Sequence, residues 1–287
     1  MANKQLVWLI TGTSTGFGRE LVLNLLARGD KAIATARARS FDKLADLKEK
    51  GADTYELDVN ASQDDLHAFA KKIIEKHGHV DVVVNNAGYM QTNTQEASAP
   101  EEVLQQFNTN VFAPMNINRA FLPYMRERKT GTIVWIGSIA GWRSNAVGSM
   151  YAATKHAVRA LSLGLHQEIL PFGLRSVCFE PGYFRTNFLG PENTTSGIPG
   201  TPAYTELLET FSTRFRAIDG KQPGDPVKAA QVMIDVVRGE GVAAGREFPP
   251  VLALGSDAYT IITGELDSAR AKLDVWKDVT SSTDLEK

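Results

Sequence analysis

Short apolar runs alternate with longer segments of helical composition along almost the whole chain. The first run, Leu-Val-Trp-Leu-Ile at residues 6–10, is continuously apolar, which is typical of a strand buried on both faces of a parallel sheet. Strand-like segments are predicted at residues 6–11, 31–36, 53–57, 80–85, 132–136, 174–180 and about 250–254. Helices are predicted between them, at residues 17–28, 41–50, 62–77, 100–128, 149–170 and 226–238.

This alternation of strands and helices predicts an α/β fold. We expect a single Rossmann-like, doubly wound domain over residues 1–287, with a mostly parallel sheet of about seven strands. Residues 182–225 depart from the pattern because they are rich in Gly, Pro, Ser and Thr. A long insertion after a strand is a suitable place for a substrate lid, which is our expectation here. Residues 257–287 are predicted to form a polar helical extension at the C-terminus.

Composition and charge exclude several classes of protein. The chain has 287 residues, of which 43% are hydrophobic, and a net charge of −2. It contains no apolar run near the roughly 20 residues of a membrane span and no signal-peptide pattern, so we expect no membrane span and a cytoplasmic location. Without blocks of Lys and Arg, a nucleic-acid partner is not expected. No ligand cluster accompanies His77 and His79, so no metal site is predicted, and the lone Cys178 is expected to be a buried strand thiol.

Three glycines separate the first predicted strand from the first predicted helix. They are Gly12, Gly16 and Gly18, in the sequence Thr-Gly-Thr-Ser-Thr-Gly-Phe-Gly. A helix that begins there presents unpaired N–H groups and the positive end of its dipole to a phosphate. The spacing differs from the usual dinucleotide fingerprint, so the alternative is an ordinary glycine-rich connection.

Tyr151 and Lys155 lie four residues apart in a predicted helix, so they share one face. To act near neutrality, a tyrosine needs its pKa lowered by about three units from 10, which requires roughly 4 kcal/mol of preferential phenolate stabilisation. One nearby lysine charge at an effective dielectric of about 20 supplies an energy of that size. The pair therefore predicts a tyrosine that donates a proton and a lysine whose charge lowers the tyrosine pKa. The alternative is a surface pair that contributes little to stability.

Other polar and small residues follow the predicted strands directly. Asn85-Asn86-Ala87-Gly88 ends the fourth strand, Ser138 follows the fifth, and Pro181-Gly182 ends the sixth. Open α/β sheets bind ligands at the carboxyl ends of their strands, so these residues are expected to meet at one edge.

Taken together, these motifs closely resemble those of the classical short-chain dehydrogenase/reductase family. Their order is Thr-Gly-x3-Gly-x-Gly, Asn-Asn-Ala-Gly, a helical Asn, a Ser after a strand, Tyr-x3-Lys and Pro-Gly, and it spans nearly the whole chain. Residues 224–226 and 254–258, followed by a long terminal helix, further resemble a branch near the retinol and 17β-hydroxysteroid dehydrogenases.

The resemblance implies a role for each motif residue. Tyr151 would protonate a carbonyl oxygen during reduction, Lys155 would lower its pKa and hold the nicotinamide ribose, and Ser138 would hydrogen-bond the same oxygen. Asn110 would complete a water-mediated proton relay with Lys155, with Asn108 as its rival and a helix-bending polar residue as the alternative. The implied cofactor contacts are Gly12, Thr13, Ser14, Thr15, Gly16, Phe17, Gly18, Asn86, Ala87, Gly88, Tyr151, Lys155, Pro181, Gly182 and Thr186.

The residues after the second strand bear on the choice of cofactor. An acidic residue there would bind the ribose hydroxyls of NAD, but the sequence has Arg37 and Arg39. Arginine pairs with a 2′-phosphate, so NADP(H) is favoured over NAD(H), although the glycine turn carries no basic residue and both arginines could be solvated surface charges. Asp58-Val59 matches the pair that contacts adenine, and the alternative for Asp58 is a capping residue.

Apolar residues near the proposed catalytic groups indicate the substrate class. Met90, Trp142, Met150, Tyr183, Phe184 and Phe188 would form an apolar pocket if they point inward, which predicts a lipophilic ketone, aldehyde or secondary alcohol. The alternatives are an NAD-dependent secondary-alcohol dehydrogenase, an epimerase or dehydratase of the extended family, and a non-enzymatic NADP(H)-sensing protein. The resemblance also implies a homodimer or homotetramer built on the long helices.

Overall fold

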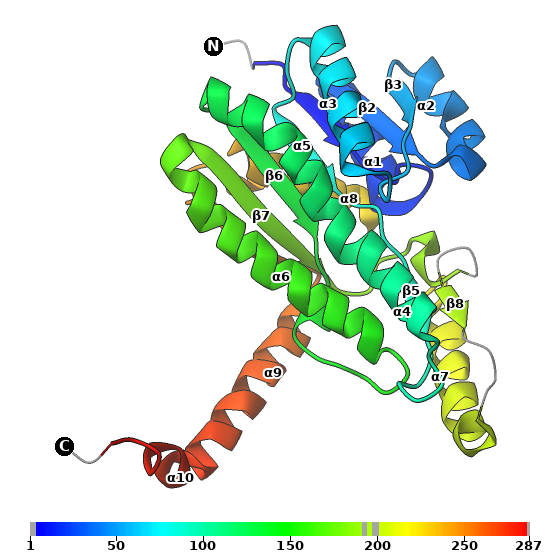
Figure 1. Ribbon diagram of the computed structural model, residues 1–287, viewed down its shortest axis with the longest axis vertical. Coiled ribbons are helices and arrows are strands. Elements are labelled where there is room, and N and C mark those ends of the chain that lie inside the picture. The colour runs from blue at the N-terminus through cyan, green and yellow to red at the C-terminus, as the bar shows by residue number, and fades with distance from the viewer. Residues whose placement is uncertain (1–3, 191–193, 197–200, 286–287) are drawn as a thin grey trace.

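A parallel seven-stranded sheet forms the centre of the computed structural model (Figure 1). The structure describes residues 4–190, 194–196 and 201–285. The strands are β1 (Val7–Ile10), β2 (Lys31–Ala36), β3 (Asp53–Glu56), β4 (Val82–Asn85), β6 (Gly131–Ile136), β7 (Leu174–Pro181) and β9 (Val251–Leu254). Their spatial order is β3-β2-β1-β4-β6-β7-β9, and every neighbouring pair is parallel. This confirms the predicted Rossmann-like fold, with the order reversing between β1 and β4.

Helices cover both faces of this sheet. One face packs on α1 (Gly16–Ala27), α2 (Ala45–Glu49) and α8 (Pro226–Arg238). The other packs on α3 (Gln63–His77), α5 (Ala113–Arg128) and α6 (Ser149–Ile169). Parallel strands need such crossover helices, and the helices leave only the strand ends open to ligands.

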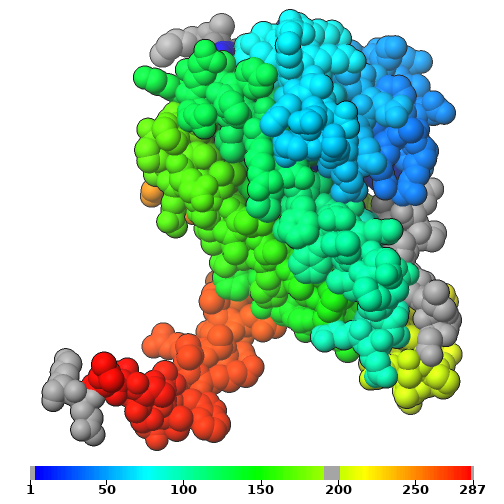
Figure 2. Space-filling model, viewed as in Figure 1, coloured from blue at the N-terminus to red at the C-terminus, as the bar shows by residue number. Residues whose placement is uncertain are grey.

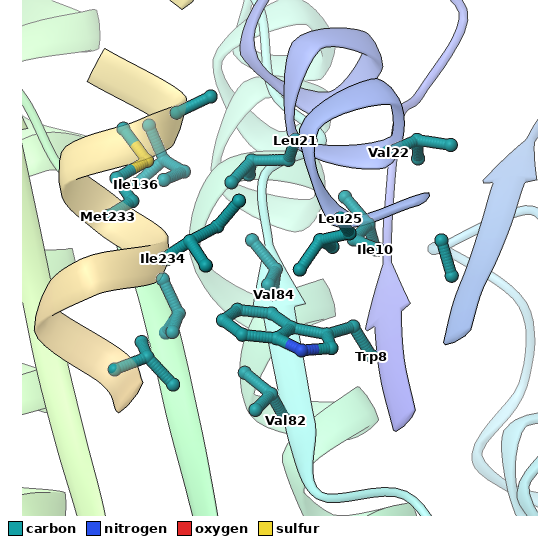
Figure 3. Packing of buried hydrophobic residues seen from close by; sticks show 14 of the residues in the cluster. Trp8, Ile10, Leu21, Val22, Leu25, Val82, Val84, Ile136, Met233 and Ile234 are labelled. Carbon is teal, nitrogen blue, oxygen red and sulfur yellow. The ribbon is translucent and has the colours of Figure 1, made fainter. Parts of the chain in front are cut away.

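The apolar side chains of β1 alternate between two cores. Trp8 and Ile10 point toward α1 and α8, where they pack with Leu21, Leu25 and Ile234 (Figure 3). Val7 and Leu9 point to the opposite face and join the core under α3 and α5. Because both faces are covered, a strand of this sheet has no polar face, which explains the continuous apolar run in the sequence.

The helix predicted over residues 100–128 is interrupted. The structure has α4 (Pro100–Phe107), a π-helical turn at Asn108–Phe112, and then α5. Pro114 has no N–H to donate to the carbonyl of Asn110 four residues earlier, and the Ala113 amide bonds to the Asn108 carbonyl instead. The helix predicted over residues 41–50 is likewise a 3₁₀ segment, Ala38–Leu44, followed by the short α2.

The segment predicted as a lid and the chain directly after β4 contain structure that the sequence pattern did not predict. β5 (Met90–Thr92) and β8 (Thr194–Ser196) form a separate two-stranded parallel sheet, and α7 (Thr205–Ile218) follows. These elements gather at one end of the molecule near α4 (Figure 1). Strands of three residues are too short to show a periodicity. Residues 191–193 and 197–200 of the predicted lid lie outside the described residues.

The C-terminal extension is helical, and most of it projects from the body of the molecule (Figure 2). It consists of α9 (Ser256–Val275) and α10 (Lys277–Ser281). Ala258 and Ile262 in the first two turns of α9 are buried, whereas Leu273 and Trp276 farther along are exposed. Among the described residues, no helix is long and apolar enough to cross a membrane.

Candidate active site

A large cavity lies at the carboxyl ends of the central strands. Segments that follow β1, β2, β4, β6 and β7 all contribute to its wall, together with α6 and α7. It therefore extends across the reversal in strand order between β1 and β4, where open α/β sheets bind ligands.

The glycine turn forms one wall of this cavity, at the beginning of α1. Ser14, Thr15, Gly16 and Phe17 line the cavity, and Gly16 adopts a left-handed backbone with φ +59°. Thr15 is the N-cap of α1, but its side chain makes no capping hydrogen bond. The first N–H groups of the helix are therefore not capped by the Thr15 side chain, as a phosphate site requires.

Close packing explains the other two glycines of the turn. A Cβ at Gly12 would lie 2.9 Å from the Cα of Ala87, and a Cβ at Gly18 would lie 2.5 Å from the Gly12 carbonyl oxygen. The Asn86 amide donates to the carbonyls of Thr11 and Gly12 at 2.8 and 2.9 Å, which joins the end of β4 to the turn. Gly18 supports the turn and is not among the residues that line the cavity.

Thr13 also lies behind the wall rather than on it. Its side chain is buried, and its hydroxyl donates to the Thr35 carbonyl at 3.1 Å. The remaining predicted cofactor contacts that do line the cavity are Gly12, Asn86, Ala87, Gly88, Pro181, Gly182 and Thr186.

Arg37 lines the cavity on the β2 side, with Ser40, Val59 and Asn60 nearby in the wall. Partial burial lowers the pKa of Arg37, and Asp58 acts in the opposite direction. Asp58 itself is exposed and does not line the cavity. Its carboxylate accepts a hydrogen bond at 3.0 Å from the Asn60 backbone amide, and the N-cap of α3 is Ser62, so Asp58 does not cap this helix.

These features fit an extended dinucleotide. The cavity offers an uncapped helix N-terminus in its middle, a guanidinium at the β2 side, and Tyr151 and Lys155 at the β6 side. No Asp or Glu is found among the described residues that line it. A cavity with cationic walls and no carboxylate suits a ligand that carries phosphates.

Ser138, Tyr151 and Lys155 meet at the β6 side. Ser138 follows β6 directly, and its Oγ accepts a hydrogen bond at 3.0 Å from the Ala140 amide, which caps the 3₁₀ turn Ile139–Gly141. Tyr151 and Lys155 lie in the first two turns of α6, and the Lys155 ammonium is 5.6 Å from the Tyr151 ring centroid. The ammonium donates to the Ile136 carbonyl at 2.7 Å. All three residues line the cavity.

Burial controls the titration of this group. It raises the pKa of the Tyr151 phenol, and hydrogen bonding with Ser138 acts in the opposite direction. It also lowers the pKa of Lys155 to about 8. The expectation that Lys155 depresses the phenol pKa differs from this structure, in which the ammonium bonds to a backbone carbonyl and desolvation is the largest influence on Tyr151.

Asn110 lies behind the cavity wall, in the π-helical turn. Its side chain accepts a hydrogen bond from the Tyr89 amide at 3.1 Å and donates to the Tyr89 carbonyl at 2.9 Å and to Thr154 Oγ1 at 3.1 Å. A Cβ at Gly88 would lie 3.2 Å from the Asn110 oxygen. The side chain therefore joins the turn after β4 to α6, and it makes no hydrogen bond to Lys155.

Four of the six predicted substrate-pocket residues line the cavity, namely Met90, Tyr183, Phe184 and Phe188. The ring of Phe188 lies 5.8 Å from that of Tyr151. Met150 is not in the wall, and neither is Trp142, whose indole N–H donates to Glu180 at 2.6 Å while the Arg159 guanidinium lies 4.0 Å above its ring. Trp142 is held by polar groups beside the site, which a sequence cannot show.

The wall also contains residues that the sequence analysis missed. They include Tyr89, Thr109, Arg143, Asn145, Leu189, Phe211, Phe215 and Gln222. Phe211 and Phe215 stack at 4.2 Å on one face of α7, and their spacing of four residues is the signal that would have predicted this helix. Nothing in the sequence pattern distinguishes Arg143 from a solvated surface charge.

Comparison with known proteins points to one family. The model of short chain dehydrogenase matches residues 6–197. The oxidoreductase BOA17 of Botryotinia fuckeliana is 31% identical over 279 residues, which cover 95% of this chain and 97% of that protein. A short-chain dehydrogenase structure from Streptomyces avermitilis is 38% identical, covers 99% of this chain and 100% of its own, and superposes with a TM-score of 0.87.

More distant structures of the same fold hold different cofactors. A metagenomic short-chain oxidoreductase in complex with NADP is 25% identical, with a TM-score of 0.66, and the match covers 87% of this chain and 96% of that one. A Burkholderia phymatum enzyme in complex with NAD is 20% identical, with a TM-score of 0.77, and the match covers 100% and 99%. The fold therefore accepts both nicotinamide dinucleotides.

Proposed function

This chain belongs to the short-chain dehydrogenase/reductase family and is an NAD(P)-dependent oxidoreductase, and from that premise we propose that it interconverts a carbonyl and an alcohol on a lipophilic small molecule with NADP(H). The observation that carries this proposal is the meeting of Ser138, Tyr151 and Lys155 in the cavity that also holds the glycine turn. A proton donor and a phosphate-binding turn in one cavity suit the reduction of a carbonyl by a nucleotide cofactor.

Ser138, Tyr151 and Lys155 have different roles in this reaction. Tyr151 donates its phenolic proton to the carbonyl oxygen as that oxygen gains negative charge, and in the reverse direction it accepts the alcohol proton. Ser138 hydrogen-bonds the same oxygen and stabilises the developing alkoxide. The nicotinamide, when bound, supplies or accepts the hydride. Apolar neighbours such as Phe188 keep water from the reacting oxygen, which strengthens both hydrogen bonds.

Lys155 provides the positive charge near the phenol. Tyr151 must pass through a partly anionic state, which burial disfavours, so a cation at 5.6 Å from its ring is needed to offset that cost. Lys155 also faces the cavity, where its ammonium would hydrogen-bond the nicotinamide ribose hydroxyls. Asn110 acts indirectly. It hydrogen-bonds both the turn at Tyr89 and Thr154 on α6, and so fixes the position of that turn relative to α6.

The preference for NADP(H) rests on Arg37. Its guanidinium lines the cavity on the β2 side, and a 2′-phosphate there would form charge-assisted hydrogen bonds with it. Among the described residues, Asp58 is the only carboxylate that acts on the pKa of Arg37, and it does not line the cavity, so the guanidinium lines the cavity without a carboxylate beside it there. NAD-dependent oxidation of a secondary alcohol is the competing function, and it requires that Arg37 contribute nothing to affinity.

The apolar walls support a lipophilic substrate. Met90, Phe188, Phe211 and Phe215 line the same cavity, and burial of apolar surface against such side chains favours an apolar ligand by roughly 25 cal/mol per Å². We assign the segment 182–225 the role of a substrate lid, since it supplies Phe188, Phe211 and Phe215 from outside the main sheet. Exposed apolar side chains of α9 and α10, such as Leu273 and Val279, support association of two or four copies, which light scattering would test.

The first experiment compares NADPH and NADH binding to the purified chain by calorimetry, followed by reduction of a panel of carbonyls. We expect tighter NADPH binding and turnover that favours lipophilic carbonyls over small polar ones. Tighter NADH binding would overturn the cofactor proposal, and equal turnover of small polar carbonyls would overturn the substrate class. Binding without turnover of any carbonyl or alcohol would contradict the catalytic proposal.

A further inference from the structure

The charged residues that line the cavity are all cations. Among the described residues they are Arg37, Arg143 and Lys155. The proposed function uses Arg37 for the adenosine phosphate and Lys155 for the ribose and the phenol. It leaves Arg143 without a role, although a guanidinium at the edge of an apolar cavity is costly to desolvate without an anion.

The strand order separates Arg143 from the adenosine side. Arg37 follows β2, and Arg143 lies in the segment after β6, with β1 and β4 between them in the sheet. Three strand spacings amount to roughly 14 Å. Arg143 also follows Ser138 by five residues in the same segment, so it belongs to the part of the cavity where the carbonyl reacts.

Arg143 has no partner within the part of the chain that the structure describes. Its guanidinium makes no ion pair and no side-chain hydrogen bond there, although the residue is only partly exposed. Arg159, which lies on the neighbouring helix α6, instead meets the Glu180 carboxylate at 3.1 Å. Arg159 is therefore paired with a carboxylate, whereas Arg143 lines a cavity with no carboxylate among its described residues.

The backbone that carries Arg143 is held in place. Its amide donates to the Ile139 carbonyl at 3.3 Å. The preceding residue, Trp142, is anchored through its indole N–H to Glu180 at 2.6 Å and under the guanidinium of Arg159 at 4.0 Å. A charge on an anchored backbone loses less conformational freedom when it binds a ligand, which favours a specific contact.

We propose that the substrate of this enzyme carries an anionic group, such as a carboxylate, at the end of an apolar body, and that Arg143 binds this group. This inference rests on the proposed function and narrows its substrate class. The carbonyl lies against Ser138 and Tyr151, the apolar body contacts Phe188 and Phe211, and the anion pairs with the guanidinium of Arg143. Asn145, which also lines the cavity, adds an amide donor beside it.

The test compares a keto acid with its neutral ester. The probes are 4-oxo-4-phenylbutanoate and its methyl ester, reduced with saturating NADPH by the wild type, Arg143→Gln, Arg143→Lys and the control Arg270→Gln. Arg270 lies on the projecting part of α9, with a side chain that is 85% exposed. We expect the wild type to prefer the acid, and we expect Arg143→Gln to reduce the acid-to-ester ratio of kcat/KM by roughly 10- to 100-fold, mainly through KM.

The two other variants make the result specific. Arg143→Lys keeps a charge but loses the planar fork, so its ratio should fall between those of the wild type and Arg143→Gln. Arg270→Gln should match the wild type. An acid-to-ester ratio that Arg143→Gln leaves unchanged, or a wild type that prefers the ester, would overturn the inference while leaving carbonyl reduction intact.

A binding measurement decides the inference if neither probe is reduced. Calorimetry would compare 4-phenylbutanoate with 4-phenylbutanamide on the NADPH complex of the wild type and of Arg143→Gln. Tighter binding of the acid that disappears in Arg143→Gln supports the anion site, and equal binding overturns it. Failure of NADPH itself to bind would instead contradict the proposed function.

Discussion

Asp257, in the first turn of α9, accepts a hydrogen bond at 2.7 Å from the backbone amide of Tyr183, in the loop that follows β7. Gly182 allows this approach, because a Cβ there would lie 2.4 Å from the Asp257 carboxylate. Gly182 and Tyr183 both line the cavity. The C-terminal helix therefore braces one wall of the active site, although most of its length projects away from the body.

Replacement of Asp257 should destabilise the cavity wall at Tyr183. In Asp257→Ala the Tyr183 amide loses its partner, so we expect the free energy of unfolding to fall by about 1–3 kcal/mol and NADPH binding to weaken. Urea denaturation and a calorimetric titration measure the two effects. Asp267→Ala, on the exposed part of the same helix, is the matched control and should change neither. Equal behaviour of the two variants would show that the brace is unimportant.

Removal of the phenolic hydroxyl should separate chemistry from binding. Tyr151→Phe keeps the ring that packs against Phe188 but cannot donate a proton, so kcat should fall by roughly 10²- to 10⁴-fold. The dissociation constant for NADPH should stay within about threefold of the wild type. The control is Tyr259→Phe, whose ring is 70% exposed on α9 and whose activity should be normal. A variant Tyr151→Phe that keeps most of its rate would mean that another group supplies the proton.

Reversal of the charge at Arg37 should change the choice of cofactor. Arg37→Asp places a carboxylate where the 2′-phosphate is expected, so the NADPH-to-NADH ratio of kcat/KM should fall by at least roughly tenfold. Arg39→Asp is a close control, because this nearby arginine is exposed like Arg37 but does not line the cavity. If the two variants shift the ratio equally, the effect is one of general surface charge and not of a specific contact.

The buried ammonium of Lys155 should make stability depend on pH. Its pKa falls from 10.5 in a free lysine to about 8 in the fold, so between these values the unfolded chain binds more protons and wild-type stability rises with pH. Lys155→Met lacks this dependence. The unfolding free energy of Lys155→Met relative to the wild type should therefore decrease by about 2 kcal/mol between pH ~6.5 and pH ~9.5.

Urea denaturation at the two pH values measures this difference. The control is Lys272→Met, which removes an exposed ammonium from α9 and should show almost no such change. A constant difference between Lys155→Met and the wild type would mean that Lys155 is hydrated in the folded protein. Such a result would also weaken the proposal that the Lys155 charge offsets the cost of a partly anionic Tyr151.

Hydrophobic pattern was sufficient to predict the main sheet. The run at residues 6–10 is apolar throughout because both faces of β1 are covered, and a strand that is buried on both faces is easy to predict from sequence. The same reasoning failed for residues 100–128, where periodicity continues through α4 and α5 while the backbone changes to a π-helical turn. Pro114, which has no N–H to donate at this turn, is visible in the sequence, but Pro123 lies within the unbroken α5, so the effect of a proline depends on how the helix is packed.

Some residues of the site could likewise be predicted from the sequence, and others could not. Ser138, Tyr151 and Lys155 could be predicted because strand ends converge at one edge and because four residues make one helical turn. Trp142 was expected in the pocket and lies outside it, whereas Arg143, its neighbour in sequence, lines the wall. Which of two adjacent side chains faces a cavity depends on the partners available to each, here Glu180 and Arg159 for the indole.

The sequence by itself determined the fold class, the glycine turn and the pairing of Tyr151 with Lys155, since these follow from local periodicity and spacing. Only the tertiary structure decided that Phe211 and Phe215 of α7 line the site, that Asp257 bonds to the Tyr183 amide, and that Arg143 lines a cavity whose described residues include no carboxylate. Those contacts join segments far apart in the chain, and their energies depend on burial and on the positions of partners, which no local pattern records.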